Sequence, residues 1–555
     1  MSLKTTNNLS AAGQFAREWP LLAGLALMGL VLFFYRLGAP GLMDPDEGRY
    51  AEIGREIWVL KDWLIPHLNF LPYLEKPPLV YWLTGLSFGG LGYREFAARL
   101  PSALSALGGV FLAYGLGRAL WGPGPGLFGA MVLATCGGYL ALGRLLTLDM
   151  PLAFFLNLAV GLGYLALSRD RRGLLPWVYL ALALGVLTKG PVAVVLPGLI
   201  WVAWALVERR TRTLRVLLSP KGLCLLAGLA LPWFVLVFWR YPAFFRFFII
   251  DQHLGRFLSN NMVYHGRPFY YYLPVLLGFM LPWSWLLPWA LGRKRSMPAS
   301  DRRFLLLWAG VILVFFSLSK GKLALYILPA LLPLSLLLGE NLFALGKGGP
   351  GFFKETGLLA TLVAWCLAGW AAVGLYLRPP PGLAALLAPA QSLWPILPAG
   401  LVLLALIPTL VLVLRQPQIF FLGALLVSLL IPLGVEKISA QRSPRDLARV
   451  LQSLWQPGSA LIGYQYYSQA MSFYSGQVFH LGNTRTELEF GRRLAPENGL
   501  FFSSSAAMMD FAASRPQAFF LVREQDYPKL EKSAPGKFHC LTRHKDCLLL
   551  VYKGK

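Results

Sequence analysis

The chain has 555 residues, of which 56% are hydrophobic and only 14% are charged. A soluble protein of this length would carry roughly 25% charged residues, so the composition excludes an ordinary water-soluble protein and indicates one that is embedded mainly in lipid. The formal net charge is +25. The sequence shows no long run of lysine and arginine and no nucleic-acid motif, so we expect no nucleic-acid partner. Basic cytoplasmic loops and anionic membrane lipid are the favoured explanation.

Hydropathy predicts about thirteen membrane-spanning helices, because apolar stretches long enough to cross ~30 Å of hydrocarbon recur along the chain. The first, from Trp19 to Tyr35, contains no charge and is followed by no small-residue cleavage site. It therefore predicts a retained span and not a signal peptide. We place the spans at residues 19–36, 98–117, 123–142, 150–168, 174–188, 191–207, 222–239, 270–291, 303–318, 324–341, 356–377, 395–414 and 418–435.

Lysine and arginine are concentrated in alternate loops, which predicts that those loops face the cytoplasm. Residues 169–172 and 209–221 are examples. The opposite set of loops contains residues 37–97 and the turn at Asp149. With a cytoplasmic N-terminus and an odd number of spans, the C-terminal tail also lies outside. We therefore predict a membrane domain over residues 1–435, whose first external loop covers residues 37–97, and a soluble external domain over residues 436–555.

The tail changes from continuous apolar runs to mixed polar sequence. Residues 443–454 predict an amphipathic helix with Ser443 as its N-cap. Short runs typical of strands follow at residues 459–464, 518–522 and 548–552. Strands that alternate with helical stretches indicate a small α/β domain.

The five cysteines show no CxxC motif and no Cys/His spacing typical of a zinc finger. Cys136, Cys224 and Cys366 lie in apolar stretches and are expected to be packing residues. Cys540 and Cys547 lie in the polar tail. If that tail is outside the cytoplasm, we expect these two cysteines to form a disulfide.

The first external loop holds the densest group of charged residues, and charges are costly in a membrane protein. It opens with the sequence MDPDEGRYAEI over residues 43–53. Asp44 and Pro45 suit the start of a helix, so one interpretation is a well-capped surface helix. The helix continues apolar along the membrane surface. An acid on it could therefore act as a general base or hold a cationic group, which is the second interpretation.

Two further motifs of this kind lie at predicted external turns. Lys76 stands beside Glu75 and before Pro77 and Pro78. The pair is either an interfacial ion pair or a lysine held rigidly beside a phosphate. Asp149 begins a predicted span. It either caps that helix or faces the same cavity as the acids of the first loop.

The loop after residue 239 adds two candidates, His253 and Arg256, which share a face at helical spacing. Arg256 is predicted as a second phosphate contact. A lone histidine is usually structural. Glu75 and His253 would be the pair for a divalent metal, but two ligands are weak evidence for a metal site.

Three lysines lie at predicted external span ends: Lys189, Lys320 and Lys322. They run against the positive-inside bias, which indicates that anions bind on this side. Tyr326, one turn beyond Lys322, is placed to donate a hydrogen bond into the same cavity.

These motifs, in this order, resemble the bacterial aminoarabinose transferases of lipid A modification. That family belongs to the polyprenyl-phosphate-sugar-dependent membrane glycosyltransferases, which include the protein O-mannosyltransferases. The first-loop motif is shared by the whole class, whereas residues 75–78 and 319–329 are closer to the aminoarabinose branch. Ala324 stands where that branch has proline. The matching stretches are residues 46–53, 63–67, 73–78, 147–149, 187–190, 253–257 and 319–329.

The resemblance implies an all-α polytopic GT-C fold with about thirteen spans, surface helices in the first loop and a small α/β periplasmic domain. It implies that Asp46 is the key acid and Asp149 a second acid. The donor phosphate would be bound by Lys76 and Arg256, with Arg49 beside them. The predicted pocket is completed by Glu47, Tyr50, Tyr73, Glu75, Lys189, His253, Lys320, Lys322 and Tyr326.

The predicted reaction is an inverting transfer of 4-amino-4-deoxy-L-arabinose from undecaprenyl phosphate to a phosphate of lipid A, at the periplasmic face of the bacterial inner membrane. We expect a monomer that contacts membrane lipid and requires no cofactor, with a divalent metal left open. One alternative is a glycosyltransferase of the same fold that acts on protein or another glycan. The alternative of another class is a lipid or sugar transporter. Transporters place charges at mid-membrane, whereas these charges lie at external span ends.

Overall fold

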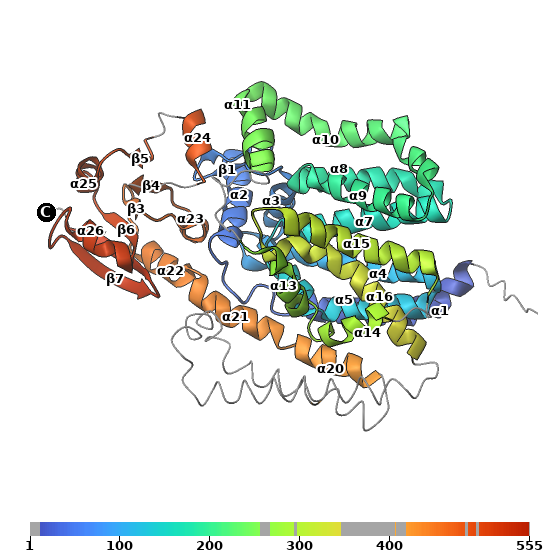
Figure 1. Cartoon of the computed structure of the whole chain (residues 1–555). Coiled ribbons are helices and arrows are strands. Elements are labelled where there is room, and N and C mark those ends of the chain that lie inside the picture. The colour runs from blue at the N-terminus through green and yellow to red at the C-terminus, as the bar shows by residue number, and fades with distance from the viewer. Residues whose placement is uncertain are drawn as a thin grey trace, which may run out of the picture.

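The computed structural model describes residues 11–255, 267–292, 297–345, 406, 418–482, 487–495 and 499–553. Long helices form a bundle, and a smaller domain that contains a β-sheet lies at one end of it (Figure 1). The first external loop lies between these two parts.

The bundle is built from the continuous apolar runs of the sequence. Such runs form helices in lipid because a helix satisfies its own backbone hydrogen bonds. Its helices are α1 (Ala11–Phe34), α4 (Glu95–Trp121), α5 (Pro123–Thr135), α6 (Gly137–Gly143), α7 (Asp149–Ser168), α8 (Leu175–Lys189), α9 (Val192–Val207), α10 (Pro220–Arg240), α13 (Tyr272–Phe279), α14 (Leu287–Gly292), α15 (Ala299–Leu318), α16 (Leu331–Leu345) and α20 (Gln418–Ser428).

Short elements connect these helices. A π-helical segment, η3, follows α10 and α11 and approaches the first loop. The connecting elements are η1 (Arg172–Leu174), η2 (Thr211–Leu218), α11 (Ala243–Phe245), η3 (Arg246–Gly255), η4 (Phe269–Tyr271), η5 (Ser284–Leu286) and η6 (Ala324–Ala330).

Within the described part of the chain, five helices are long and apolar enough to cross a membrane, and seven spans result if each of two bent pairs is one span. The predicted spans at 123–142 and 270–291 are those bent pairs, with bends of 68° and 114°. The predicted spans at 356–377 and 395–414 lie outside the described residues. The total of about thirteen spans therefore stays a prediction.

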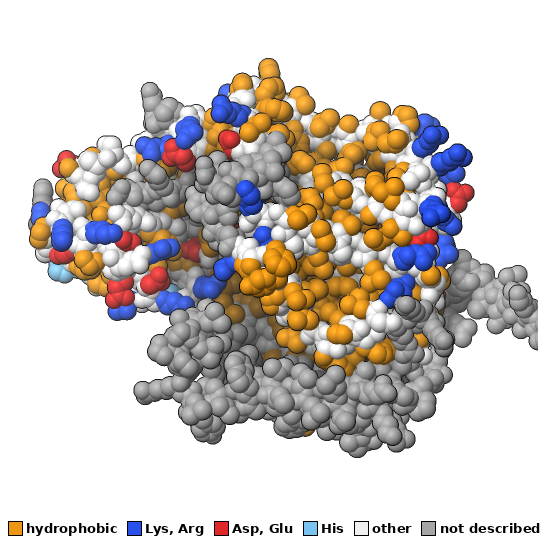
Figure 2. All heavy atoms as spheres, viewed as in Figure 1, with side chains coloured by type: hydrophobic (Ala, Val, Ile, Leu, Met, Phe, Trp, Pro, Cys, Tyr) orange, Lys and Arg blue, Asp and Glu red, His pale blue; other side chains and the backbone are white. Residues whose placement is uncertain are grey.

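The surface of the bundle matches a membrane environment. Apolar side chains cover the helices, and lysine and arginine gather at the end remote from the sheet domain (Figure 2). Val235 and Trp239 of α10 are 60% and 83% exposed, which is expected for side chains that face lipid. The basic end contains the loops that the sequence predicts to be cytoplasmic.

The first external loop folds into α2 (Asp46–Leu60), a hairpin of β1 (His67–Leu68) and β2 (Leu71–Pro72), and α3 (Leu79–Leu91). The predicted surface helix is thus present, but the expected cap is not. The Asp44 carboxylate accepts hydrogen bonds from the Ala470 backbone N–H, at 2.8 Å, and from the Ser468 hydroxyl. Asp44 therefore binds the start of a helix in the C-terminal domain, α23 (Gln469–Ser475), and not its own helix.

The C-terminal domain is built on a six-stranded mixed sheet of order β5-β4-β3-β6-β8-β7. The three predicted strands are confirmed as β3 (Ala460–Tyr464), β6 (Ala518–Arg523) and β8 (Cys547–Tyr552). Three further strands were not predicted from the sequence: β4 (Phe479–Gly482), β5 (Phe501–Phe502) and β7 (Phe538–His544). β3 pairs in parallel with β4 and β6, whereas β8 pairs antiparallel with β6 and β7.

The predicted disulfide is wrong, because Cys540 and Cys547 are both free thiols. They lie on the β7–β8 hairpin, where Cys540 is opposite Leu550 and Cys547 is opposite His544. Four residues of strand separate the two positions along the ladder, which is about 13 Å at ~3.3 Å per residue. A disulfide needs Cα atoms within ~7 Å of each other.

The two faces of the sheet bury different sets of residues. Ile462 and Phe520 face α25 (Ser505–Ala513) and α26 (Tyr527–Glu531), which lie on the outer side of the domain. Leu461 and Phe519, their neighbours on the same strands, join a core that includes residues of the first loop such as Ile53. Successive strand residues point to opposite faces. The inner face of the sheet therefore packs against the first loop.

Polar contacts reinforce this packing. Asn69, in the β1–β2 turn, donates to the Phe479 carbonyl at 2.9 Å and accepts from the Phe479 N–H at 2.8 Å, so one side chain satisfies both backbone groups of that β4 residue. α24 (Glu489–Leu494) packs on β2, with the Gly491 backbone against Pro72. The hairpin of the first loop is thus held against the C-terminal domain.

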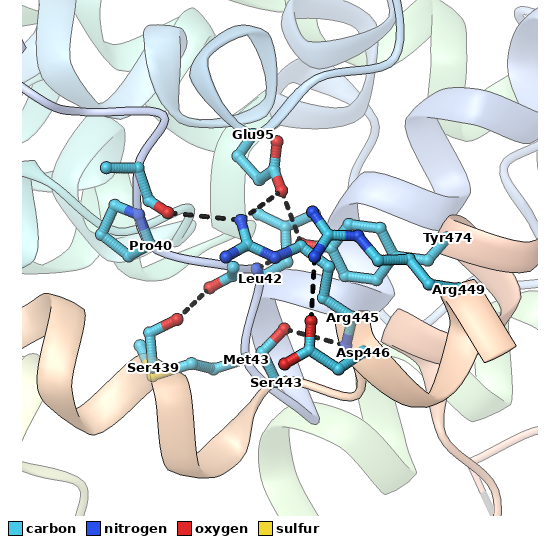
Figure 3. Close-up of polar contacts among 12 residues, drawn as sticks. Pro40, Leu42, Met43, Glu95, Ser439, Ser443, Arg445, Asp446, Arg449 and Tyr474 are labelled. Atoms are coloured by element: carbon cyan, nitrogen blue, oxygen red, sulfur yellow. Dashed lines mark hydrogen bonds and ion pairs between the residues drawn. The ribbon is translucent and has the colours of Figure 1, made fainter.

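A second set of contacts joins the domain to the entrance of the loop (Figure 3). α21 (Ile431–Arg442) runs without a break through the predicted domain boundary at residue 436, and α22 (Arg445–Leu454) is the predicted amphipathic helix. Glu95 accepts from Arg445 at 3.2 Å and from the Tyr474 hydroxyl at 3.1 Å. The Leu42 N–H donates to the same hydroxyl at 2.7 Å.

A glycine in α2 allows the closest approach between the loop and the domain. A Cβ atom built on Gly48 would lie 2.6 Å from the Ala470 Cα atom, which is backbone and cannot rotate away. We expect Gly48→Ala to cost about 1–3 kcal/mol of stability and to weaken the docking of α23. Thermal unfolding of the purified full chain measures this. Gly90→Ala is the matched control, because no atom from outside its own helix lies within 4 Å of its Cβ position. Equal melting temperatures for the two variants would contradict this account of the interface.

Candidate active site

The start of α2, the start of α7, the end of α8 and η6 bring five predicted residues together: Asp46, Arg49, Asp149, Lys189 and Tyr326. We call these five residues the polar cluster. The Lys189 ammonium donates to the Asp149 carboxylate at 2.5 Å and lies 4.6 Å from the centre of the Tyr326 ring. The side chains of Asp149 and Lys189 are 15% and 16% exposed. They form a largely buried ion pair between the start of α7 and the end of α8.

Asp46 is the open member of the cluster, with a side chain that is 57% exposed. Surrounding protein limits the hydration of its carboxylate, and this desolvation raises the pKa of Asp46. The positive charge of Arg49 opposes the rise, and the negative charge of Asp149 adds to it. Asp46 is thus both accessible to a substrate and tuned toward proton exchange at higher pH than an ordinary aspartate.

Arg49 is held between two carboxylates. Its Nη1 donates to Asp46 at 3.2 Å, and its Nε donates to Glu487 of the C-terminal domain at 3.2 Å. Its guanidinium carbon lies 6.0 Å from the centre of the Tyr50 ring. Tyr50 in turn packs against Tyr81 of α3, with ring centres 5.8 Å apart.

Tyr73, Glu75 and Lys76 directly follow the hairpin, and the first of them lies close to Arg49. Tyr73 is 2% exposed, and its N–H donates to the Pro66 carbonyl at 2.7 Å. Its buried phenol interacts electrostatically with Glu75 and Arg49, and burial raises the pKa of Tyr73. Lys76 Nζ donates to the Glu75 carbonyl at 3.1 Å. Its role in phosphate binding stays a prediction.

Glu47 does not share the exposure of Asp46. Its carboxylate accepts from Arg99 of α4 at 2.8 and 2.9 Å and from the Leu146 N–H at 2.9 Å. Glu47 and Arg99 are 3% and 0% exposed. The predicted pocket residue is therefore a buried anchor that fixes α2 against α4 and against the turn before Asp149.

Lys320 and Lys322, which the sequence places at one predicted span end, differ from each other. Lys322 is buried and its ammonium donates to the Ser319 carbonyl, whereas Lys320 is exposed. The prediction for Arg256 lies outside the described residues, and so does the side chain of His253. In the part of the chain that the structure describes, no group of three or more His, Cys, Asp or Glu residues could hold a metal. The Glu75–His253 hypothesis stays untested.

The chain is similar to known membrane glycosyltransferases. Residues 75–239 match the family model described as dolichyl-phosphate-mannose-protein mannosyltransferase. The chain is 37% identical, over 66% of its length and 67% of the relative's, to undecaprenyl phosphate-alpha-4-amino-4-deoxy-L-arabinose arabinosyl transferase 1 of Pseudomonas fluorescens. The chain belongs to this arabinosyltransferase family. The undecaprenyl phosphate-alpha-4-amino-4-deoxy-L-arabinose arabinosyl transferase of Pseudomonas aeruginosa is 39% identical over 62% of this chain and 63% of its own length.

Among solved structures, the chain is similar to ArnT from Cupriavidus metallidurans bound to undecaprenyl phosphate. The TM-score is 0.83, the identity is 26%, and the match covers 97% of this chain and 98% of that one. The fold of this arabinosyltransferase family member is therefore the expected polytopic GT-C fold, with its small C-terminal sheet.

Sequence reasoning missed two residues of the site in this arabinosyltransferase. Tyr81 is fully buried, and its hydroxyl has no hydrogen-bond partner in the described structure. Tyr81 lies in α3, whose sequence is apolar and contains no motif, so the sequence around it gives no indication of a functional role. Glu487 lies 438 residues from Arg49 in a polar tail, where a single glutamate carries no motif.

The contact between Asp44 and α23 gives this arabinosyltransferase a pH-dependent term in stability. Burial raises the pKa of Asp44 from 3.8 to about 6, although the hydrogen bonds from Ser468 and Ala470 oppose the rise. A carboxyl whose pKa is raised binds its proton more tightly in the folded state. The free energy of unfolding therefore decreases as pH rises from about 4 to about 6.

We expect Asp44→Asn to remove this term, because an amide does not titrate and its oxygen still accepts from Ala470. The melting temperature of the variant relative to the wild type should therefore be higher at pH 8 than at pH 4.5, as measured by thermal unfolding. Asp446→Asn, at a carboxylate that is 70% exposed, is the control and should show little pH dependence. A relative stability of Asp44→Asn that is the same at both pH values would refute the assignment.

Proposed function

We propose that this protein transfers 4-amino-4-deoxy-L-arabinose from undecaprenyl phosphate to a phosphate of lipid A. The observation that carries the proposal is the polar cluster, which joins an exposed carboxylate to buried cations at one end of an apolar bundle. The Pseudomonas relatives are named for the same lipid-linked sugar, and the Cupriavidus structure holds undecaprenyl phosphate.

The transfer breaks one bond and forms one. An oxygen of the acceptor attacks the anomeric carbon of the sugar while the bond from that carbon to the undecaprenyl phosphate oxygen breaks. The electron pair of this bond leaves with the phosphate, and attack from the opposite face inverts the configuration. Negative charge grows on the leaving phosphate. Lys76, Arg49 and Arg256 are the cations proposed to stabilise it.

The acceptor determines the role of Asp46. A phosphate acceptor is already ionised, so Asp46 would orient it or hold the cationic amino group of the sugar. A hydroxyl acceptor must lose a proton, and Asp46, with its raised pKa, would then be the general base. Lys189 holds Asp149 beside this carboxylate in either case. The scheme itself calls for no cofactor.

We propose that the polar cluster and the C-terminal domain lie on the periplasmic side of a bacterial inner membrane, with about thirteen spans in the whole chain. The apolar belt and the basic far end of the bundle support this orientation. A monomer is proposed as the active form, because one chain supplies every residue of the polar cluster.

The match of residues 75–239 to a mannosyltransferase family model favours one rival, which is transfer to a hydroxyl of a protein or glycan. Mass spectrometry of lipid A from cells with and without this protein tests the choice. Aminoarabinose on lipid A only when the protein is present supports the proposal. Unchanged lipid A together with a labelled protein or glycan would establish the rival instead.

We expect Asp46→Asn to lower the rate of sugar transfer by at least ~100-fold, because the neutral amide can neither accept a proton nor pair with a cationic group. Transfer by purified protein from the lipid-linked donor measures this. Asp170→Asn, at a carboxylate that is 80% exposed in a basic loop, is the matched control and should retain full activity. An Asp46→Asn variant with near-normal turnover would remove Asp46 from the mechanism.

A further inference from the structure

The C-terminal domain reaches the polar cluster through Glu487. The Nε atom of Arg49 donates to Glu487 at 3.2 Å across a separation of 438 residues. The side chains of Arg49 and Glu487 are only 16% and 19% exposed. An ion pair with so little access to water is screened less than a surface pair and is held more rigidly.

Glu487 is itself fixed by the domain. The Gln469 amide donates to the same carboxylate oxygen that binds Arg49, and Gln469 is 4% exposed. Gln469 is the first residue of α23, the helix whose N-terminus is bound by Asp44. These contacts link Asp44 of the first loop to α23, α23 to Glu487, and Glu487 back to Arg49 of the first loop.

The contacts engage two of the three guanidinium nitrogen atoms of Arg49. Asp46 accepts a hydrogen bond from Nη1 and Glu487 accepts one from Nε, whereas Nη2 has no hydrogen-bond partner among the residues that the structure describes. The guanidinium is planar, so fixing two of its nitrogen atoms fixes the direction of the third. Arg49 thus presents a preset donor, which suits recognition of a phosphate.

We propose that Glu487 is a positioning residue for the phosphate of the lipid-linked donor and that it acts through Arg49. The C-terminal domain is then part of the active site. This inference rests on the proposed function, in which Arg49 binds that phosphate. Glu487 does not touch the substrate. It orders the side chain that does, so less conformational entropy is lost when the phosphate binds.

Binding of undecaprenyl phosphate to the purified full chain in detergent tests the inference. We expect Glu487→Ala to weaken binding by about tenfold, within the range measured for coupled neighbours. Glu487→Asp should recover part of the affinity, because it keeps a carboxylate. In an Arg49→Ala background, Glu487→Ala should have no further effect, since the residue through which it acts is gone.

Glu489→Ala is the matched control, because its carboxylate pairs with Arg493 on the surface and is 50% exposed. It should bind like the wild type, and melting temperatures of all variants check that they fold. Wild-type protein that does not bind undecaprenyl phosphate would contradict the proposed function itself. Wild-type binding with an unaffected Glu487→Ala variant would overturn only the inference about Glu487. If Glu487→Ala lowered the affinity for undecaprenyl phosphate equally in the wild type and in the Arg49→Ala background, the inference would also be overturned. The effect would then come from the domain interface and not from Arg49.

Discussion

The buried ion pair between Glu47 and Arg99 is the interaction on which the site depends. Arg99 is fully buried on α4, and its guanidinium also donates to the carbonyls of Leu37, Pro40 and Gly41. Burying two charges is costly unless each is paired and its hydrogen bonds are satisfied, and here both conditions hold. The pair fixes the entrance of the first loop, the start of α2 and, through Leu146, the turn that precedes Asp149. Removing either partner would leave an uncompensated charge inside the protein.

The first turn of α2 is therefore held from two directions. Glu47 ties it to the membrane bundle, while Asp44 and Arg49 tie it to the C-terminal domain. Asp46 lies between these anchors and is the one carboxylate of the four-residue stretch 44–47 that stays largely exposed. Asp44 precedes α2, and Asp46 and Glu47 point in different directions from its first turn, so a short acidic motif can serve three tasks at once. A transfer reaction needs its reacting groups to be aligned, and an accessible acid held by rigid neighbours can align a substrate group.

The sequence was informative where a physical rule acts locally. Apolar length located the described bundle helices, and charges at span ends that the sequence predicts to be external led to Asp149 and Lys189, which the structure shows as a pair. Local rules failed where the partner is distant. The capping rule assigned Asp44 to its own helix, but the helix start that it binds is more than 400 residues away. Glu487 carries no signal of its own.

The missed strands have a similar explanation. β5 has only two residues, and β7 lies at an edge where only one of its seven side chains is fully buried, so neither shows the apolar alternation of a buried strand. The expected disulfide failed because spacing along the chain says nothing of register across a hairpin.

The proposed function requires that the lipid-linked donor binds at the polar cluster, next to the C-terminal domain. A structure of the full chain with undecaprenyl phosphate bound tests it most directly. We expect the phosphate within hydrogen-bonding distance of the Arg49 guanidinium, with the pair between Arg49 and Glu487 retained. A phosphate bound at the basic far end of the bundle, or away from Arg49, would contradict the account.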